Sequence, residues 1–229
     1  MKIQNFSHIK TWVFDLDNTL YPPEVRLFDQ IEKKMRKFVA NFLNVSLSEA
    51  DTLREKYWRS HGTTLAGMMD NHSMPPDDFL KFVHDIDFSV IPASPSIASL
   101  LAALPGRKIV YTNGTEPYAR KVLQARQLES EFEAVYGIEH ANYRPKPLAE
   151  AFKQVFDQAN ITPNNSAMFE DDHRNLKVPA RLGMKTVFVS PELQIPNYVD
   201  IAHPNLEVLL SQIVTTCFPE RLNVILKKI

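Results

Sequence analysis

The sequence predicts an α/β fold: a mostly parallel sheet with helices on both faces, and an all-helical cap domain inserted after the first strand. From residue 91 onward, strand-like and helix-like segments alternate, which is typical of a parallel sheet. A short apolar strand at 11–14 is followed by a stretch, 22–90, that is helical throughout. The first strand is expected to join the later sheet. We therefore predict a core domain of residues 1–21 and 91–229 and a cap domain of residues 22–90.

The cap stretch carries three helix signals. Apolar residues recur at helical spacing from Phe28 to Phe42, which predicts an amphipathic helix. Ser46 with Glu49 after it forms a capping-box pattern, which predicts a second helix that continues to Trp58. The proline pair at 75–76 opens a third helix, because proline is tolerated in a first helical turn.

The later part of the chain alternates in type. We expect strands at 108–113, 134–138, 166–172 and 185–190, and helices at 94–104, 117–128, 148–159, 176–183 and 206–214. In an open parallel sheet, ligands bind beyond the carboxyl ends of the strands. The residues that follow these strands are therefore the ones to inspect for function.

Composition narrows the classes of partner. A formal net charge of −1 gives no reason to expect a nucleic acid polymer or a membrane surface. The single cysteine, Cys217, excludes an internal disulfide, and without a cysteine cluster or H-E-x-x-H spacing zinc is not expected. No apolar run approaches the roughly 20 residues that span a bilayer, and the N-terminal segment lacks a continuous apolar region of a signal peptide. We expect a cytoplasmic protein that acts on a small molecule; its oligomeric state stays open.

Four polar segments stand where the chain leaves a strand or enters a helix. They are "DLD" at 15–17, "TNG" at 112–114, "RPKP" at 144–147 and "EDD" at 170–172. Each alone can be turn or helix-start chemistry. Together, and in this order on an alternating α/β pattern, they indicate one site.

The residue types in these segments fit phosphoryl chemistry. Acids from two strand ends make an oxygen-rich site of the kind that Mg²⁺ prefers. The Thr112 hydroxyl with adjacent backbone amides can bind phosphate oxygens, and Lys146 adds a positive charge. Asp15 can attack phosphorus, and Asp17, on the same face of an extended strand, can act as acid and base.

The order D-x-D-x-T, T-N, K-P and D-D resembles the haloacid dehalogenase (HAD) superfamily of phosphatases, over essentially the whole chain. The resemblance implies a Rossmann-like core, Mg²⁺ as cofactor, and a helical cap of the C1 type that closes over substrates. It implies that Thr112 and Asn113 hold the phosphoryl group. It also implies that Lys146 holds the nucleophile and the phosphate in place.

For the acids, the resemblance implies separate roles. Asp15 would be the nucleophile and a magnesium ligand, and Asp17 the general acid/base that binds magnesium through its backbone carbonyl. Asp171 and Asp172 would complete the metal site. The chain departs from the family pattern at Glu170, because relatives commonly have an apolar residue there and a serine after the acid pair. Which two of these three acids reach the metal is left open; we favour Asp171 and Asp172, with Glu170 as an outer partner.

A narrower likeness is carried by "DLDNTLYP", "HGTTLAGM", "YTNGT", "YRPKP" and "FEDDHRNL". Together these motifs are similar to the pyrimidine 5'-nucleotidase-like family. That similarity implies removal of phosphate from nucleoside monophosphates such as UMP and CMP. Within the cap signature, His61, Thr63 and Thr64 either face the substrate or only cap a helix and form a turn. Tyr21 either lines the leaving-group pocket or packs under the cap hinge.

Other functions stay open at this point. One is a broad-specificity sugar-phosphate phosphatase or a phosphomutase of the same superfamily. Another is a non-catalytic phosphate-binding scaffold, since a fold alone does not guarantee a function. A dehalogenase needs the first aspartate but no magnesium site, so Asp17 and the acids at 170–172 argue against it.

Overall fold

The computed structural model describes residues 6–192 and 194–223. Its strands form one six-stranded sheet in the order β3-β2-β1-β4-β5-β6, and every neighbouring pair is parallel. The strands are β1 (Thr11–Phe14), β2 (Arg107–Tyr111), β3 (Ala134–Tyr136), β4 (Ser166–Glu170), β5 (Lys185–Phe188) and β6 (Ile201–Ala202). The predicted parallel α/β fold is confirmed, and the short edge strand β6 is an addition to it.

The centre of the sheet is where the strand order reverses. β1 pairs with β2 on one side and with β4 on the other, and Phe14 is in register with both Val110 and Phe169. The residues just after these three strands therefore lie at one level of the sheet. A ligand crevice is expected at such a reversal, beyond the carboxyl ends of the strands.

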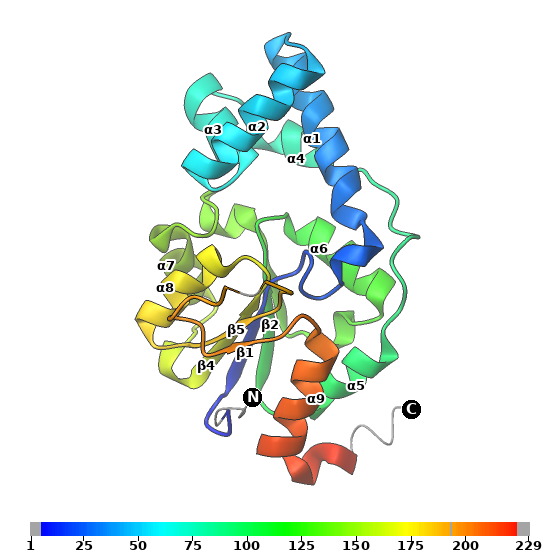
Figure 1. Ribbon diagram of the computed structural model, residues 1–229, viewed down its shortest axis with the longest axis vertical. Helices are drawn as coiled ribbons and strands as arrows, with labels where there is room; N and C mark the ends of the chain where they lie inside the picture. Colours follow the sequence, from blue (N-terminus) through cyan, green and yellow to red (C-terminus); the bar gives the residue numbers. More distant parts are fainter. Residues whose placement is uncertain (1–5, 193, 224–229) are drawn as a thin grey trace.

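Helices cover both faces of the sheet (Figure 1). The α-helices are α1 (Leu27–Leu43), α2 (Leu47–His61), α3 (Thr64–His72), α4 (Pro76–Val83), α5 (Pro95–Ala103), α6 (Glu116–Arg126), α7 (Ala149–Gln158), α8 (His173–Leu182) and α9 (Leu206–Cys217). Short 3-10 helices are η1 (Pro23–Val25), η2 (Glu129–Glu131), η3 (Ile138–Ala141), η4 (Pro163–Asn165) and η5 (Pro219–Arg221). No α-helix in the described ranges is both long and apolar enough to cross a membrane.

The hydrophobic core is divided by the sheet. Alternate strand residues point to opposite faces, so Phe14 and Phe169 join one buried cluster while Val13 and Met168 join the other. The second cluster is completed by side chains of α7 and α8, such as Phe152. Both faces of the central strands are therefore buried, which explains why the middle residues of these strands are apolar.

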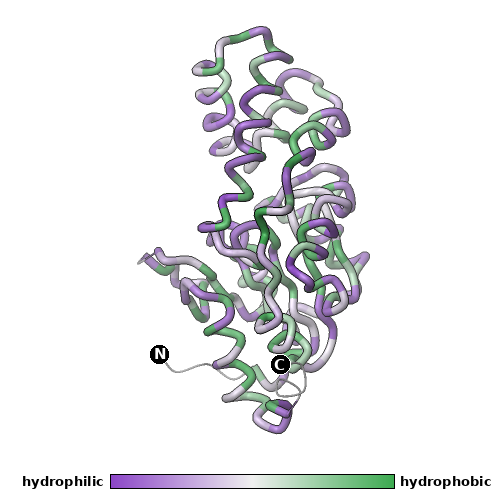
Figure 2. The backbone as a smooth tube through the Cα atoms, turned by 90° about the vertical axis from the view of Figure 1, so that its right-hand side faces the viewer, coloured by the Kyte–Doolittle hydropathy of each residue, from purple (hydrophilic) through white to green (hydrophobic). Residues whose placement is uncertain are grey.

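Helices α1–α4 lie together beyond the carboxyl-end edge of the sheet (Figure 1). Hydrophobic and hydrophilic segments alternate along them (Figure 2), as expected for amphipathic helices. The capping box at α2 is present: the Glu49 amide donates to Ser46 Oγ at 3.2 Å, and the Ser46 amide donates to Glu49 Oε2 at 2.9 Å. We call α1–α4 the cap helices; the domain boundaries at 22 and 90 remain a prediction.

The sequence predicted helical structure throughout 22–90 but did not define a separate helix at the position of α3. This helix begins at Thr63, whose Oγ1 accepts from the Ala66 amide at 3.1 Å, and it packs on α2. The packing is close because Gly67 faces Tyr57: a Cβ at this glycine would lie 2.2 Å from Tyr57 Cγ. The cap signature in the sequence is thus largely the α2–α3 turn and its close helix contact.

One buried arginine ties together the two segments that connect the cap helices to the sheet. Arg126 is 4% exposed; its Nε donates to the Leu20 carbonyl at 3.1 Å and its Nη1 to the Pro92 carbonyl at 2.7 Å. Leu20 belongs to the segment that leaves β1, and Pro92 to the segment that returns toward α5. The ends of both connections are therefore held side by side.

Candidate active site

The predicted nucleophile and lysine meet in a buried ion cluster. Lys146 Nζ donates to Asp15 Oδ1 at 2.7 Å, to Glu170 Oε2 at 2.6 Å and to the Tyr111 carbonyl at 3.0 Å. Lys146 and Glu170 are each 1% exposed, and Asp15 is 6% exposed. Because a buried ammonium needs such partners, the lysine fixes the orientation of the Asp15 carboxylate.

Asn113 holds the loop that carries this lysine. The Lys146 amide donates to Asn113 Oδ1 at 2.8 Å, and Asn113 Nδ2 donates to the Lys146 carbonyl at 3.2 Å. The Asn113 side chain, which was predicted to hold the phosphoryl group, is therefore hydrogen-bonded to the backbone of the neighbouring loop. Thr112, 1% exposed, accepts from the Gly114 amide through Oγ1 at 2.9 Å.

The third carboxylate of the cluster is Asp171. One ligand atom each of Asp15, Glu170 and Asp171 lies within 4.8 Å of the others. Burial, and then the charge of Asp15, raises the pKa of Glu170; burial, and then the charge of Glu170, raises the pKa of Asp171. These oxygen ligands suit Mg²⁺, and a divalent cation would offset their mutual repulsion. The residues present therefore fit a magnesium ion.

The structure differs from the preferred pair of acids at this strand end. Asp172 accepts the Arg174 amide as the N-cap of α8 and forms an ion pair with the Arg174 guanidinium. It lies outside the group formed with Asp15, while Glu170 lies within it. The reason is that β4 ends at Glu170, so that the turn into α8 directs Asp172 to the helix terminus.

Asp17 is held separately, by two tyrosines. Its Oδ1 accepts from the Tyr21 hydroxyl at 2.6 Å and from the Tyr118 hydroxyl at 2.5 Å. Burial, and then the charge of Asp15, raises the pKa of Asp17 to about 6. A carboxyl with a pKa near neutrality is suited to give and take a proton. Burial, and then Asp17, raises the pKa of Tyr118 well above its usual range, so this phenol stays a donor.

Comparison with known proteins identifies the group to which this site belongs. A model of the haloacid dehalogenase-like hydrolase family matches residues 9–183, a span that includes the ends of β1, β2 and β4 and the loop with Lys146. The chain belongs to this family. The resemblance drawn from the sequence motifs is thereby confirmed at the level of the superfamily.

Individual relatives of this hydrolase are distant. Phosphate metabolism protein 8 of Saccharomyces cerevisiae is 26% identical, over 76% of this chain and 60% of that protein. The chain thus spans less than two thirds of the length of this curated relative. Among solved structures, the HAD phosphatase of Thermococcus onnurineus is 16% identical with a TM-score of 0.59, covering 90% of this chain and 98% of its own. The L-2-haloacid dehalogenase of Xanthobacter autotrophicus is 15% identical with a TM-score of 0.59, covering 91% and 100%. These two likenesses show the fold.

The hydrolase has a cavity of about 770 Å³ between the strand ends and the cap helices. The strand-end side contributes Asp15, Asp17, Thr112, Asn113, Lys146, Glu170, Asp171 and Asp172. The cap side contributes apolar residues (Phe28, Ile31, Met35, Leu65, Phe79, Leu80, Val83) and charged ones (Glu32, Asp51, Arg54, Glu55). One wall of the cavity is thus lined by polar side chains, and the other by both apolar and charged ones. This composition is expected of a site for a small molecule.

Of the residues predicted as possible cap or substrate contacts, two line the cavity and two do not. Thr63 and Thr64 line the cavity, and Thr63 also caps α3. His61 lies outside the lining, where its ring nitrogens contact Ser60 Oγ at 2.7 Å and Asn71 Nδ2 at 3.3 Å. Tyr21 is fully buried and reaches the site only through its hydroxyl, which donates to Asp17.

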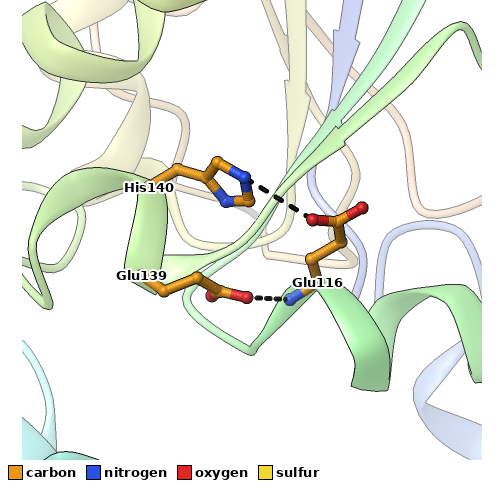
Figure 3. Close-up of side chains that lie close together, drawn as sticks. All are labelled: Glu116, Glu139 and His140. Carbon is orange, nitrogen blue, oxygen red and sulfur yellow. Dashed lines mark hydrogen bonds and ion pairs between the residues drawn. The ribbon is translucent and has the colours of Figure 1, made fainter.

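A second group of metal-ligating side chains lies on the loop after β3 and the start of α6 (Figure 3). Glu139 Oε1 accepts from the Glu116 amide at 2.8 Å, so it satisfies the helix N-terminus. His140 Nδ1 accepts from the Gly137 amide at 3.1 Å, and its Nε2 lies 3.5 Å from Glu116 Oε2. These contacts occupy Glu139 Oε1 and His140 Nδ1 in loop and helix-end packing, while Glu139 Oε2 is buried without a hydrogen-bond partner.

Proposed function

We propose that this hydrolase is a magnesium-dependent phosphatase that acts on small phosphomonoesters through a phosphoryl group carried by Asp15. The observation that supports the proposal most is the pair of differently held acids at one cavity. Asp15 is oriented by Lys146, and Asp17 is held apart from that cluster by two tyrosines. A nucleophile and a separate acid/base are what two-step phosphate transfer requires.

The metal would be held by carboxylate oxygens of Asp15, Glu170 and Asp171, with the Asp17 carbonyl as a further ligand. When bound, Mg²⁺ would screen the repulsion between the anionic phosphate and the attacking carboxylate. Lys146 contributes the same kind of screening through Nζ, which lies 2.7 Å from Asp15 Oδ1. Thr112 and the backbone amides after β2 would hold the phosphoryl oxygens.

The protein groups then account for both steps. In the first, an Asp15 oxygen forms a bond to phosphorus, the bond from phosphorus to the leaving oxygen breaks, and Asp17 gives its proton to that oxygen. In the second, Asp17 takes a proton from water as the water oxygen bonds to phosphorus and the Asp15 carboxylate is released. The first step leaves Asp17 deprotonated and Asp15 phosphorylated, which is where the second step begins. The second step restores a protonated Asp17 and a free Asp15, so the cycle closes.

For the substrate we propose pyrimidine nucleoside 5'-monophosphates such as UMP and CMP. Support comes from the motifs shared with the pyrimidine 5'-nucleotidase-like family and from a cavity whose volume is in the range of sites for ligands of this size. The name of the yeast relative, a phosphate metabolism protein, is consistent with phosphate chemistry. A cytoplasmic location remains a prediction of the sequence.

The test is phosphate release from a panel of phosphomonoesters (UMP, CMP, dUMP, sugar phosphates and pyridoxal phosphate) with Mg²⁺ and with EDTA. We expect metal-dependent release with UMP or CMP as the best substrates, and its loss in Asp15→Asn. Equal slow release from the whole panel would contradict the nucleotide assignment. Release of halide from 2-haloacids, with no release of phosphate, would replace the phosphatase with a dehalogenase.

A further inference from the structure

The two carboxylate oxygens of Asp17 have different surroundings. Both tyrosine hydroxyls that reach this side chain donate to the same atom, Oδ1, at 2.6 Å from Tyr21 and 2.5 Å from Tyr118. An sp² oxygen has two lone pairs, so these two donors fill its capacity. The other oxygen, Oδ2, takes no part in these two bonds.

The two donors come from separate elements and are each firmly placed. Tyr21 follows β1, is 0% exposed, and is preceded by Leu20, whose carbonyl accepts from the buried Arg126. Tyr118 lies in the first turn of α6 and is 2% exposed. Because both rings are buried, neither hydroxyl can move from Asp17 without repacking of the core.

The setting of Tyr118 includes a residue from the cap side of the molecule. The His84 ring, at the end of α4, stacks on the Tyr118 ring with centroids 4.3 Å apart and an interplanar angle of 12°. On another side, Gly114 leaves room for the ring, because a Cβ there would lie 2.7 Å from Tyr118 Cδ1. The tyrosine that holds Asp17 is thus itself fixed by both the cap segment and the loop after β2.

We infer that Tyr21 and Tyr118 are positioning residues that anchor Asp17 through Oδ1, so that Oδ2 is the atom that exchanges a proton with the leaving group and with water. This inference rests on the proposed phosphatase function. In the neutral acid, Oδ1 is the carbonyl oxygen and still accepts both phenol protons, while Oδ2 carries the hydrogen. As the bond from phosphorus to the leaving oxygen breaks, that hydrogen passes from Oδ2 to the leaving oxygen and Asp17 becomes a carboxylate. The water of the second step returns a proton to the same atom.

The inference makes a specific kinetic prediction, because proton donation matters only for leaving groups that depart poorly as anions. We would measure kcat/KM for a series of substituted phenyl phosphates, from phenyl to p-nitrophenyl phosphate, with Mg²⁺ present. These esters are similar in size and differ in the basicity of the leaving oxygen. The ratio kcat/KM reports the steps up to the first irreversible one, so it is sensitive to cleavage of the ester.

For Tyr118→Phe and Tyr21→Phe, we expect kcat/KM on phenyl phosphate to fall about 10-fold each, and more in the double variant, since a positioned acid contributes about 10²–10⁴-fold. On p-nitrophenyl phosphate the loss should stay within about 3-fold. The dependence on leaving-group basicity therefore becomes steeper, as it does in Asp17→Asn. Tyr57→Phe is the matched control, because Tyr57 is 3% exposed and its hydroxyl contacts His72 Nε2 at 2.6 Å.

The outcomes are distinguishable. Equal losses on all esters, with an unchanged slope, would mean that the tyrosines only support the structure, and would overturn the inference. A wild-type protein that releases phosphate neither from these esters nor from UMP and CMP would instead overturn the proposed function. Each single variant removes one oxygen atom and is compared with wild type by thermal unfolding, so a folding defect in the double variant leaves the test intact.

Discussion

The charged groups at the strand ends and those on the cap helices are organised in opposite ways. At the strand ends, Lys146, Glu170 and Asp15 are buried and bonded to one another. On the cap, pairs such as Arg59 with Glu55 have side chains that are 70% and 62% exposed. Removing one partner of the first kind leaves a charge stranded out of water, whereas removing one of the second kind only returns a charge to water. Position in the fold, and not the number of ion pairs, sets the energetic value of a charge.

The two regions also touch beside the cavity, where α8 meets α2. Arg174 of α8 places its Cζ 3.8 Å from the centroid of the Trp58 ring on α2, while its guanidinium pairs with Asp172. This contact places the ion-pair partner of Asp172 against a cap helix. It links Arg174, which is close in sequence to the acids at 170–172, to Trp58 of the cap helices.

The largest effect is expected from Lys146→Met. Loss of the ammonium leaves Asp15 and Glu170 buried without a counter-charge, which should lower the free energy of unfolding by about 3–5 kcal/mol. Urea unfolding in the presence of EDTA measures this. Arg59→Met on α2 is the control, since Arg59 is 70% exposed in its pair with Glu55, and the loss in stability should be within about 0.5 kcal/mol. Similar losses in the two variants would refute the contrast between the regions.

The next effect distinguishes the acids that follow β4. Glu170→Gln and Asp171→Asn should each lower kcat/KM about 100-fold at fixed Mg²⁺, because each removes a carboxylate from the group around Asp15. Asp172→Asn should stay within about 5-fold, since asparagine is an equally good N-cap and only the pair with Arg174 is lost. Phosphate release at several Mg²⁺ concentrations checks this, and the reverse ranking would restore Asp172 as a ligand.

A smaller effect is expected from the protonation of His84, which should make the free energy of unfolding depend on pH. Burial, and then the charge of Lys121, lowers the pKa of His84 to about 4 from its usual 6.5. Between these values the unfolded chain binds the proton and the folded chain does not, so stability falls as the pH drops from about 6.5 to 4. The neighbours of His84 are the Tyr118 ring and Thr115 Oγ1, which lies 3.1 Å from its Nδ1.

The variant His84→Phe keeps an aromatic ring at this position but binds no proton. As the pH drops from about 6.5 to 4, its free energy of unfolding should therefore fall by about 2–3 kcal/mol less than that of wild type. The readout is the free energy of unfolding from urea titrations at pH 7, 6, 5 and 4. His8→Phe, at an exposed histidine, serves as the control. Parallel curves for wild type and His84→Phe would contradict the expectation.

The strand-end site was accessible to sequence reasoning because it depends on local pattern. An apolar run that stops at Asp15 and another that stops before Thr112 place both residues at one edge of a parallel sheet. The sequence could not show that Glu170, and not Asp172, lies in the group around Asp15, because strand ends are hard to locate to within a residue or two. The predicted strand ran to residue 172, and the observed one ends at Glu170.

The cap was less predictable for a physical reason. Helix α3 depends on the close approach of Gly67 to Tyr57, which is a tertiary contact with no local signature. Tyr118 is similar: its place on α6 follows the pattern, but its bond to Asp17, a residue 101 positions earlier, does not. Asn113 belongs to a sequence motif, but its hydrogen bonds to the backbone of Lys146, 33 residues later, have no local signal in the sequence.

The division of labour between Asp15 and Asp17 is tested most directly by a single burst experiment. Asp17→Asn is mixed with p-nitrophenyl phosphate and Mg²⁺, because this ester does not need a proton to release its leaving group but the second step still needs a base. We expect a burst of one p-nitrophenol per active site followed by slow turnover, with the phosphoryl group found by mass spectrometry on the acid-quenched peptide that contains Asp15. Turnover without a burst, or a phosphoryl group on any other residue, would contradict the two-step mechanism.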